Sequence, residues 1–508
     1  MIFNNQAVIT VNGKKVSAEK GVYLSKILKG EMGCGGKGKC GKCKVIAKGN
    51  LSGYSESEKS LLSKEELSQN IRLACCTIVE GGCEVFTLSE TEGEHTQIIT
   101  DGVMPEFSVK PAFSRYGVAV DIGTTTLAAK LYSEKGELLA SVSSLNPQYE
   151  WGADVISRIE AALNGEDRRK LSLAIKKAID GILSDLALSA GISSQEIDGI
   201  VITGNTVMLY LLVEESTEPL SHAPFIVKKL FGETVTADFL ELTRVKADTR
   251  VYIPPCISAF IGADTVCAML STEMCNGTDT CMLVDIGTNG EMALWHNGEL
   301  NVCSTAAGPA FEGVGISMGM RGAKGAIDKV SVEEKEIKCH IIGGECPKGI
   351  CGSGLVDAIA AMLETEILDE TGFLECDEYT LQEPVKLTQK DIRAVQLAKS
   401  AIYAGLYTLL KSSEITANTV DNLYIAGGFG NYLNIGNAEK IGLIPGGFAE
   451  KARVMGNAAL SGAVMLLLNT DYIDRCNLLA KKAGVIELSS NPVFSEQYML
   501  GMILGRQI

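Results

Sequence analysis

The chain has 508 residues, with 46 Lys and Arg against 62 Asp and Glu, and its formal net charge is −16. This length predicts more than one domain, and 46% hydrophobic residues supply enough apolar surface for packed cores. The acidic balance excludes a typical nucleic-acid binder, because affinity for phosphate backbones rests on Lys and Arg. No signal-peptide pattern opens the chain, and no apolar run reaches the ~20 residues that span a bilayer. We therefore expect a cytoplasmic protein with no membrane partner.

The N-terminal part predicts a small domain of short strands around a loop rich in glycine and cysteine. Strands are expected at Ala7–Val11, Lys42–Ala47 and Cys83–Leu88, and a helix is expected near Glu56–Gln69. After this part, acidic residues and a loss of apolar periodicity predict a linker.

A long internal repeat divides the remainder of the chain. A buried strand at Tyr116–Val120 leads into the sequence DIGTTT at 121–126, and a second at Cys281–Val284 leads into DIGTNG at 285–290. The separation of about 160 residues predicts two similar lobes in which strands and helices alternate. The predicted boundaries are an N-terminal domain at 1–92, a linker at 93–115, and α/β lobes at 116–276 and 277–508.

The cysteine-rich loop carries Cys34, Cys40 and Cys43, and Cys75 follows 32 residues after Cys43. Glycines let the loop fold tightly around a small inorganic core, and four thiolates hold two irons. We therefore predict a 2Fe–2S cluster. Structural zinc and free thiols are the alternatives, but zinc sites usually supply two close cysteine pairs.

The five-residue first gap and the Arg-Leu-Ala-Cys75 context resemble the adrenodoxin-like branch of the ferredoxins. The resemblance implies a ferredoxin-like α+β (β-grasp) domain, and it favours Cys75 over the adjacent Cys76 as fourth ligand. Four lysines surround the loop and either guide an acidic redox partner or are simply solvated; they are Lys37, Lys39, Lys42 and Lys44. The ten cysteines from Cys256 onward are expected to be reduced free thiols.

Each repeated loop offers what a phosphate cradle needs: small residues, backbone N–H groups, hydroxyls and a carboxylate. We expect Asp121 and Asp285 to position Mg²⁺, mostly through water. Glu291 is predicted either to orient the attacking water or to form a surface ion pair, and Glu312 is a candidate for contact with a ribose. The expected phosphate-binding residues are Gly123, Thr124, Thr125, Thr126, Gly287, Thr288, Asn289 and Gly290.

The two loops resemble the phosphate loops of the ASKHA superfamily, which includes actin, Hsp70 and sugar kinases. The resemblance implies an ATP site between two lobes. The segment 427–430, with Gly427, Gly428 and Phe429, resembles the turn that packs on adenosine. The chain contains no Walker A motif and no GxGxxG after a strand, so P-loop and Rossmann folds are disfavoured.

Nearly the whole chain resembles one family, the reductive activators of corrinoid proteins. Besides the ferredoxin-like domain and both loops, the resemblance rests on 146–148, 152–158, 203–205, 262–264, 308–312 and 427–430. It implies an ATP-hydrolysing enzyme that passes one electron from its 2Fe–2S cluster to a Co(II) corrinoid protein of a methyltransferase system, regenerating Co(I). It also implies a separate electron donor and a homodimer. Relatives carry an extra middle domain, for which residues 90–115 leave no room.

Several other functions stay open at this point. One is a small-molecule kinase with a redox-sensing domain, in which Asp264 acts as general base unless it merely caps a helix. Another is an activator of a different low-potential metalloenzyme, such as a 2-hydroxyacyl-CoA dehydratase. The last is a ferredoxin-type carrier with a regulatory ATPase part.

Overall fold

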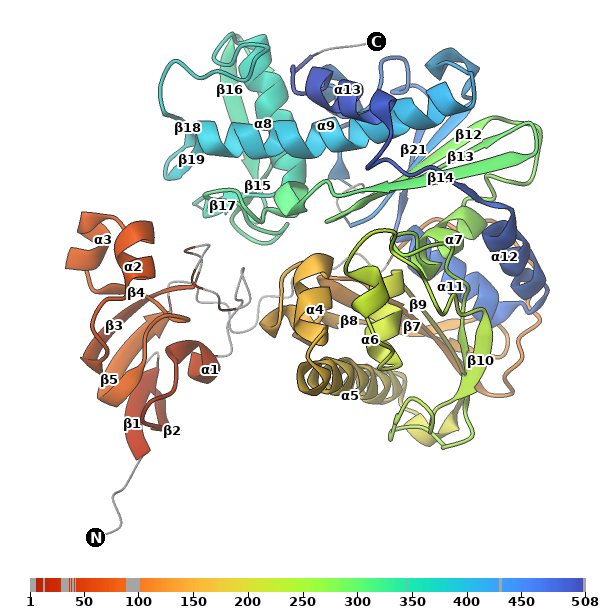
Figure 1. Cartoon of the computed structure of the whole chain (residues 1–508), viewed down its shortest axis with the longest axis horizontal. Coiled ribbons are helices and arrows are strands. Elements are labelled where there is room, and N and C mark those ends of the chain that lie inside the picture. The colour runs from red at the N-terminus through yellow and green to blue at the C-terminus, as the bar shows by residue number, and fades with distance from the viewer. Residues whose placement is uncertain are drawn as a thin grey trace. The chain divides into compact units, whose positions relative to one another are not determined.

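The computed structural model describes residues 6–11, 14–28, 36, 38, 41, 43–87, 101–344, 346–428 and 432–505. The chain forms two compact units, one of residues 1–94 with 147–171 and one of residues 95–146 with 172–508 (Figure 1). Among the described residues, no helix is both long and apolar enough to cross a membrane.

The first unit is built on a five-stranded sheet of order β2-β1-β5-β3-β4, in which β1 and β5 run parallel. Its core contains Ile9, Leu24, Leu73 and Val85, all without exposed surface. The predicted ferredoxin-like α+β fold is confirmed. The elements are β1 (Gln6–Val11), β2 (Lys14–Glu19), α1 (Leu24–Leu28), β3 (Lys44–Leu51), α2 (Glu56–Leu61), α3 (Lys64–Ser68), β4 (Ile71–Leu73) and β5 (Val79–Thr87).

The helical stretch predicted near Glu56–Gln69 consists of two short helices in the structure, α2 and α3. Ser63 interrupts the helix: its hydroxyl accepts a hydrogen bond from the Glu66 amide, and its own amide donates to the Glu66 carboxylate. This reciprocal pair is a capping box, which starts a new helix after the break.

The second unit contains the predicted repeat as two six-stranded sheets, of order β10-β11-β9-β6-β7-β8 and β21-β20-β12-β13-β14-β22. In each sheet a DIGT loop joins two antiparallel strands, and the strand before the loop also pairs in parallel with a later strand. The strands are β6 (Tyr116–Ile122), β7 (Thr126–Ser133), β8 (Leu138–Leu145), β9 (Ile197–Gly204), β10 (Glu233–Thr236), β11 (Arg250–Ile253), β12 (Cys281–Ile286), β13 (Gly290–His296), β14 (Glu299–Thr305), β20 (Asn422–Ala426), β21 (Ala452–Gly456) and β22 (Gly484–Val485).

Helices and two small sheets complete the fold, and the two-lobed α/β prediction is confirmed. The helices are α4 (Val155–Ala162), α5 (Gly165–Ala190), α6 (Thr206–Leu212), α7 (Ala263–Ser271), α8 (Gly352–Glu364), α9 (Gln389–Ser412), α10 (Ile435–Lys440), α11 (Ala458–Leu468), α12 (Asp471–Lys482) and α13 (Pro492–Leu500). The small sheets contain β15 (Ala326–Glu333), β16 (Glu336–Ile341), β17 (Gly349–Ile350), β18 (Glu378–Gln382) and β19 (Val385–Thr388).

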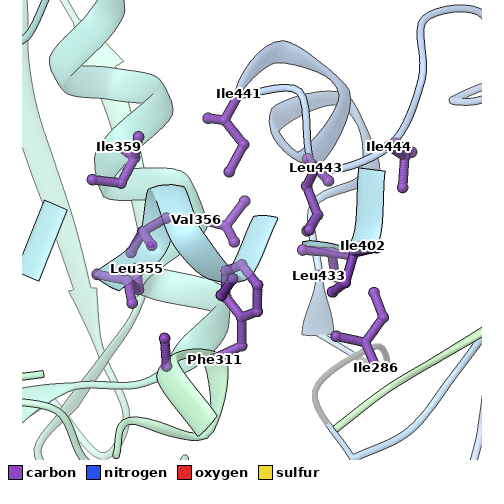
Figure 2. Packing of buried hydrophobic residues seen from close by; sticks show 14 of the residues in the cluster. Ile286, Phe311, Leu355, Val356, Ile359, Ile402, Leu433, Ile441, Leu443 and Ile444 are labelled. Atoms are coloured by element: carbon purple, nitrogen blue, oxygen red, sulfur yellow. The ribbon is translucent and has the colours of Figure 1, made fainter. Parts of the chain in front are cut away.

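An apolar core packs next to the second DIGT loop (Figure 2). Ile286 and Phe311 lie in this core with Ile402 of α9, and each is at most 2% exposed. Because Ile286 precedes Gly287 and Phe311 precedes Glu312, burial of these two side chains fixes where the polar residues of the loop region stand.

Candidate functional site

Two of the four predicted cluster ligands come together at one end of the β3–β4 ladder. Lys44 pairs with Leu73 there, so the residues just beyond this pair meet. The Sγ atoms of Cys43 and Cys75 lie 3.2 Å apart, and the Cys75 amide donates to the Cys43 sulfur at 3.4 Å. Cys34 and Cys40 lie outside the described residues.

The environment of these two thiols fits a bound metal centre. The hydrogen bond between the Cys43 and Cys75 side chains lowers the pKa of the Cys43 thiol to about 7, against the opposing effect of burial. The same contact and burial raise the pKa of Cys75. Two buried sulfurs this close cannot both be thiolates unless a cation lies between them, and coordination to iron supplies that positive charge.

Cys76 follows Cys75 directly and is the alternative fourth ligand. Its sulfur is 3.7 Å from that of Cys75, and its side chain is half-buried, whereas Cys43 and Cys75 are buried. The geometry thus favours Cys75 as the partner of Cys43.

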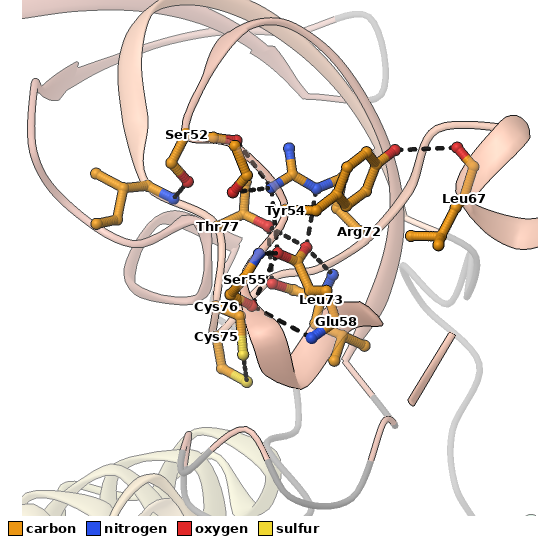
Figure 3. Close-up of polar contacts among 12 residues, drawn as sticks. Ser52, Tyr54, Ser55, Glu58, Leu67, Arg72, Leu73, Cys75, Cys76 and Thr77 are labelled. Atoms are coloured by element: carbon orange, nitrogen blue, oxygen red, sulfur yellow. Dashed lines mark hydrogen bonds and ion pairs between the residues drawn. The ribbon is translucent and has the colours of Figure 1, made fainter. Parts of the chain in front are cut away.

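A buried ion pair supports the turn that carries Cys75 (Figure 3). Glu58 is fully buried, and its carboxylate accepts from Arg72 Nε at 2.8 Å, from the Leu73 amide at 3.1 Å and from the Thr77 hydroxyl at 3.1 Å. Burial alone would raise the pKa of Glu58, but Arg72 and the backbone amides of Ser55 and Leu73 outweigh it and lower the pKa. The turn is therefore held by a carboxylate whose charge is fully compensated.

The predicted lysine group around the loop is only partly described. Lys44 forms an ion pair with Glu66 at 2.5 Å, so its charge is already partnered within the domain. Lys37, Lys39 and Lys42 lie outside the described residues.

In the second unit, Glu312 joins the two DIGT loops. Its carboxylate accepts a hydrogen bond from the Thr125 hydroxyl of the first loop at 3.1 Å and from the Thr288 hydroxyl of the second loop at 3.0 Å. Glu312 ends the short 3₁₀ helix Pro309–Glu312. The contact that we predicted with a ribose stays a prediction, whereas this bridging contact was not anticipated.

Three asparagines hold the first loop in place. Asn146 donates to the Gly123 carbonyl at 2.8 Å, and Asn205 donates to the Thr124 hydroxyl at 3.1 Å. Asn457 donates to Asp121 Oδ2 at 3.0 Å. Asn146 and Asn205 belong to segments that carried the family resemblance, whereas Asn457 was not predicted, and no spacing signal connects it with Asp121.

Five half-buried carboxyl groups gather around the loops with little positive charge among them. Burial raises the pKa of Asp121 and of Asp285 to about 7, and nearby acidic groups add to the shift. Burial likewise raises the pKa of Asp264 to about 6, and the pKa values of Glu291 and Glu312 are also raised. Carboxylate oxygens are the ligands of Mg²⁺, and a divalent cation would favour the ionised forms that burial disfavours.

The five carboxyl groups lie too far apart to coordinate a metal ion with protein ligands alone. Across the described parts of the chain, no three His, Cys, Asp or Glu side chains converge closely enough to hold a metal directly. Mg²⁺ usually keeps several waters and takes substrate phosphates as ligands, so this arrangement fits the outer-sphere role predicted for the aspartates.

Glu291 lies opposite Asp285 in the β12–β13 ladder and interacts unfavourably with Asp264 and Asp285. None of the ion pairs found between described residues includes it. The alternative of a surface ion pair is therefore disfavoured. Asp264 lies in the first turn of α7, where its Oδ1 accepts from the Thr265 amide at 2.7 Å.

The predicted glycine-rich turn lies against the second loop. Gly427 has φ of +97°, and a Cβ there would come within 2.5 Å of the Ile286 carbonyl oxygen and 2.6 Å of Asp285 Oδ1. Only glycine fits this position. Gly428 follows directly, and Phe429 lies outside the described residues. The ten cysteines from Cys256 onward are free thiols.

Three family models match successive parts of the chain. Residues 9–80 match a 2Fe-2S iron-sulfur cluster binding domain, residues 116–277 match the RACo middle region, and residues 279–507 match the C-terminal ASKHA domain of RACo. The middle region thus coincides with the span that we predicted as the first lobe.

Two curated proteins and one solved structure are similar over most of their length. The corrinoid activation enzyme RamQ of Eubacterium limosum is 33% identical over 478 residues, covering 87% of this chain and 79% of that protein. The [Co(II) methylated amine-specific corrinoid protein] reductase of Methanosarcina barkeri is 27% identical over 427 residues, covering 76% of each. A structure of a reductive activator for corrinoid, iron-sulfur protein has a TM-score of 0.71 and 26% identity, with 98% of both chains covered.

This coverage corrects one expectation. We expected the chain to lack a middle domain present in relatives, but a middle-region model matches residues 116–277, and 98% of the similar structure has a counterpart here. The expectation was wrong because it placed the middle region before the first DIGT loop rather than around it.

Proposed function

Because the chain belongs to the family of reductive activators of corrinoid proteins, it reductively activates a corrinoid protein, and we propose that ATP drives this electron transfer. One observation carries the proposal: a pair of buried thiols 3.2 Å apart and two DIGT loops joined by Glu312 occur on the same chain. The reaction is a one-electron reduction of the partner's Co(II) to Co(I), with ATP hydrolysed to ADP and phosphate.

We propose that Cys34, Cys40, Cys43 and Cys75 hold the 2Fe–2S cluster. A cluster held there would supply one-electron redox chemistry between an electron donor and the cobalt. The role of the protein is to hold the Cys75 turn rigid through Glu58 and to keep the site largely dry. Clusters of the plant type have potentials near about −400 mV, so a still harder acceptor needs added conformational work.

At the nucleotide site, the proposed roles follow from charge and hydrogen bonding. Asp121 and Asp285 position Mg²⁺ through water, and the loop amides and threonine hydroxyls bind phosphate oxygens. Glu291, which is half-buried and lies opposite Asp285 in the β12–β13 ladder, is suited to orient the attacking water. Glu312 keeps both loops at a fixed separation, so phosphates bound to one loop are aligned with the other.

The same proposal includes a separate low-potential electron donor, a homodimer and a cytoplasmic location that keeps the cysteines reduced. Mass measurement of the purified protein tests the dimer directly. A monomeric mass at working concentration would remove the dimer from the proposal without affecting the electron transfer.

The decisive experiment is anaerobic. The iron-loaded protein, a reductant and a purified Co(II) corrinoid protein are mixed with and without Mg²⁺ and ATP, and the Co(I) absorption band is followed. We expect the band to appear at a rate that depends on ATP. A phosphorylated metabolite formed with no ATP-dependent Co(I) would establish the kinase alternative instead.

A further inference from the structure

Residues 101–110, which follow the N-terminal domain in the chain and are here named the strap, are fastened to the ATPase part. The Val103 amide donates to the Met455 carbonyl at 3.0 Å, and the Asn457 amide donates to the Asp101 carbonyl at 3.1 Å. Gly102 and Gly456 form an antiparallel bridge between these two bonds. The strap therefore extends the end of β21 by a short paired segment.

The fit at Gly102 leaves no space for a side chain. A Cβ there would lie 2.5 Å from the Asn457 carbonyl oxygen and even closer to the Ser461 hydroxyl. Because one of these two obstacles is a backbone carbonyl, turning the Ser461 side chain cannot relieve the clash, and the strap would have to move away from Asn457.

Asn457 connects the strap with the nucleotide site. Its backbone N–H donates to the Asp101 carbonyl of the strap. Its side-chain Oδ1 accepts from the Leu460 amide at 2.7 Å as the N-cap of α11, and its Nδ2 donates to Asp121 at 3.0 Å. The neighbouring Gly456 carbonyl accepts from the Gly427 amide at 3.1 Å. Residues 456 and 457, which pair with the strap, are thus each one hydrogen bond away from a part of the nucleotide site. Asn457 binds Asp121 of the first DIGT loop, and Gly456 binds Gly427 of the glycine-rich turn.

A second attachment joins the strap to the strand that leaves the first loop. Asp101 forms an ion pair at 3.1 Å with Lys130, whose side chain is only 8% exposed. Lys130 lies on β7, which begins at Thr126 of that loop. The first residue of the strap, Asp101, therefore contacts both Asn457, which binds Asp121, and Lys130 on the strand that follows the first loop.

We propose that the strap is a coupling element: through Asn457 and Lys130 it transmits the nucleotide state at Asp121 to the linker that carries the N-terminal domain. Binding of Mg²⁺ and ATP changes the charge next to Asp121, so the hydrogen bond from Asn457 changes with it. The proposal rests on the nucleotide site of the proposed function, but it does not depend on electron transfer to a corrinoid. Coupling between two sites is reciprocal, so loosening the strap must also change the affinity for nucleotide.

The test compares Gly102→Ala with Gly181→Ala, a matched change at a helical glycine where an added Cβ meets nothing within 4 Å. In the unaltered chain, we expect hydrogen exchange of the Val103 and Asn457 amides to change when a non-hydrolysable ATP analogue binds. In Gly102→Ala, we expect the affinity for the analogue to change by about fivefold or more, the lower end of typical coupling. Gly181→Ala should match the unaltered chain.

A further variant keeps the outcomes separate. Asp101→Asn removes the ion pair with Lys130 but keeps the backbone bonds, and it should also reduce the nucleotide effect on exchange, even where Gly102→Ala folds poorly. The coupling would be overturned if the exchange rates did not change when the ATP analogue binds and if both glycine variants bound the analogue with equal affinity. Neither measurement uses a corrinoid, so failure of the proposed function would appear only in the Co(I) assay.

Discussion

The two functional regions shift the pKa values of their carboxyl groups in opposite directions. Glu58 in the ferredoxin domain is fully buried, yet Arg72 and backbone donors hold its pKa below the usual value. Asp121 and Asp285 in the ATPase part also lie in a poorly solvated setting, but their neighbours are other acids, and the pKa of each rises to about 7.

The difference distinguishes a structural network, in which Glu58 already has all its partners, from a binding site whose acidic groups need a cation. A buried ion pair whose hydrogen bonds are all made holds one geometry and needs nothing further. A group of acids without enough compensating charge is costly until a cation binds, and such groups concentrate at functional sites. The ferredoxin domain thus holds Cys43 and Cys75 in a preformed frame, whereas the ATPase part should respond strongly to Mg²⁺ and nucleotide.

The largest expected effect is loss of the cluster. Cys75→Ser replaces the thiolate nearest Cys43 with a weak iron ligand, so iron should fall from about two per chain to near zero, and ATP-dependent Co(I) formation should stop. Iron and acid-labile sulfide assays measure this. Cys76→Ser is the matched control and should keep its iron. The reverse pattern would make Cys76 the ligand.

Asp285→Asn tests the acidic site of the ATPase part. Removing a carboxylate that positions Mg²⁺ should lower the ATPase rate about 100-fold, the size typical for loss of one electrostatic contact in an active site. Turnover of ATP at saturating Mg²⁺ is the measurement. Asp248→Asn changes an exposed aspartate and should leave the rate unchanged. Equal rates in the two variants would remove Asp285 from the site.

The repeat could be predicted from sequence because a strand, a DIGT loop and a second strand are local and occur twice. The bridge at Glu312 could not, since Thr125 is 187 residues away and the contact depends on how η4 (Pro309–Glu312) packs. The same holds for Asn457, which lies 336 residues from Asp121. Local patterns identified the loops, and tertiary packing decided which distant side chains hold them.

Glu58→Gln should destabilise the ferredoxin domain by about 3 kcal/mol, because it leaves the buried Arg72 charge without a full partner. The midpoint of urea unfolding, followed through the visible absorption of the cluster, measures the loss. Glu56→Gln is the matched control, since Glu56 forms only an exposed ion pair with Lys59 and should give no measurable change. Equal midpoints for both variants would mean that Arg72 finds compensation elsewhere.

The smallest effect is a dependence of stability on pH, with opposite signs in the two regions. Asp121 and Asp285 have raised pKa values, so without metal they stabilise the folded state most when protonated, and that contribution is lost as pH rises toward about 7. Glu58 has a lowered pKa, so its contribution is present above its usual pKa and is lost only as pH falls through the lowered value.

Denaturant unfolding of the metal-free protein at about pH 5.5 and about pH 8 should therefore show the ATPase part losing stability at the higher pH. Asp121→Asn should flatten this change, because the amide does not titrate, whereas Asp248→Asn should not. Mg²⁺ with ATP should restore stability most at the higher pH, where the carboxylates are ionised and ready to pair with the cation. A metal-free ATPase part that gains stability with rising pH would mean that these acids are already compensated by the protein, as Glu58 is.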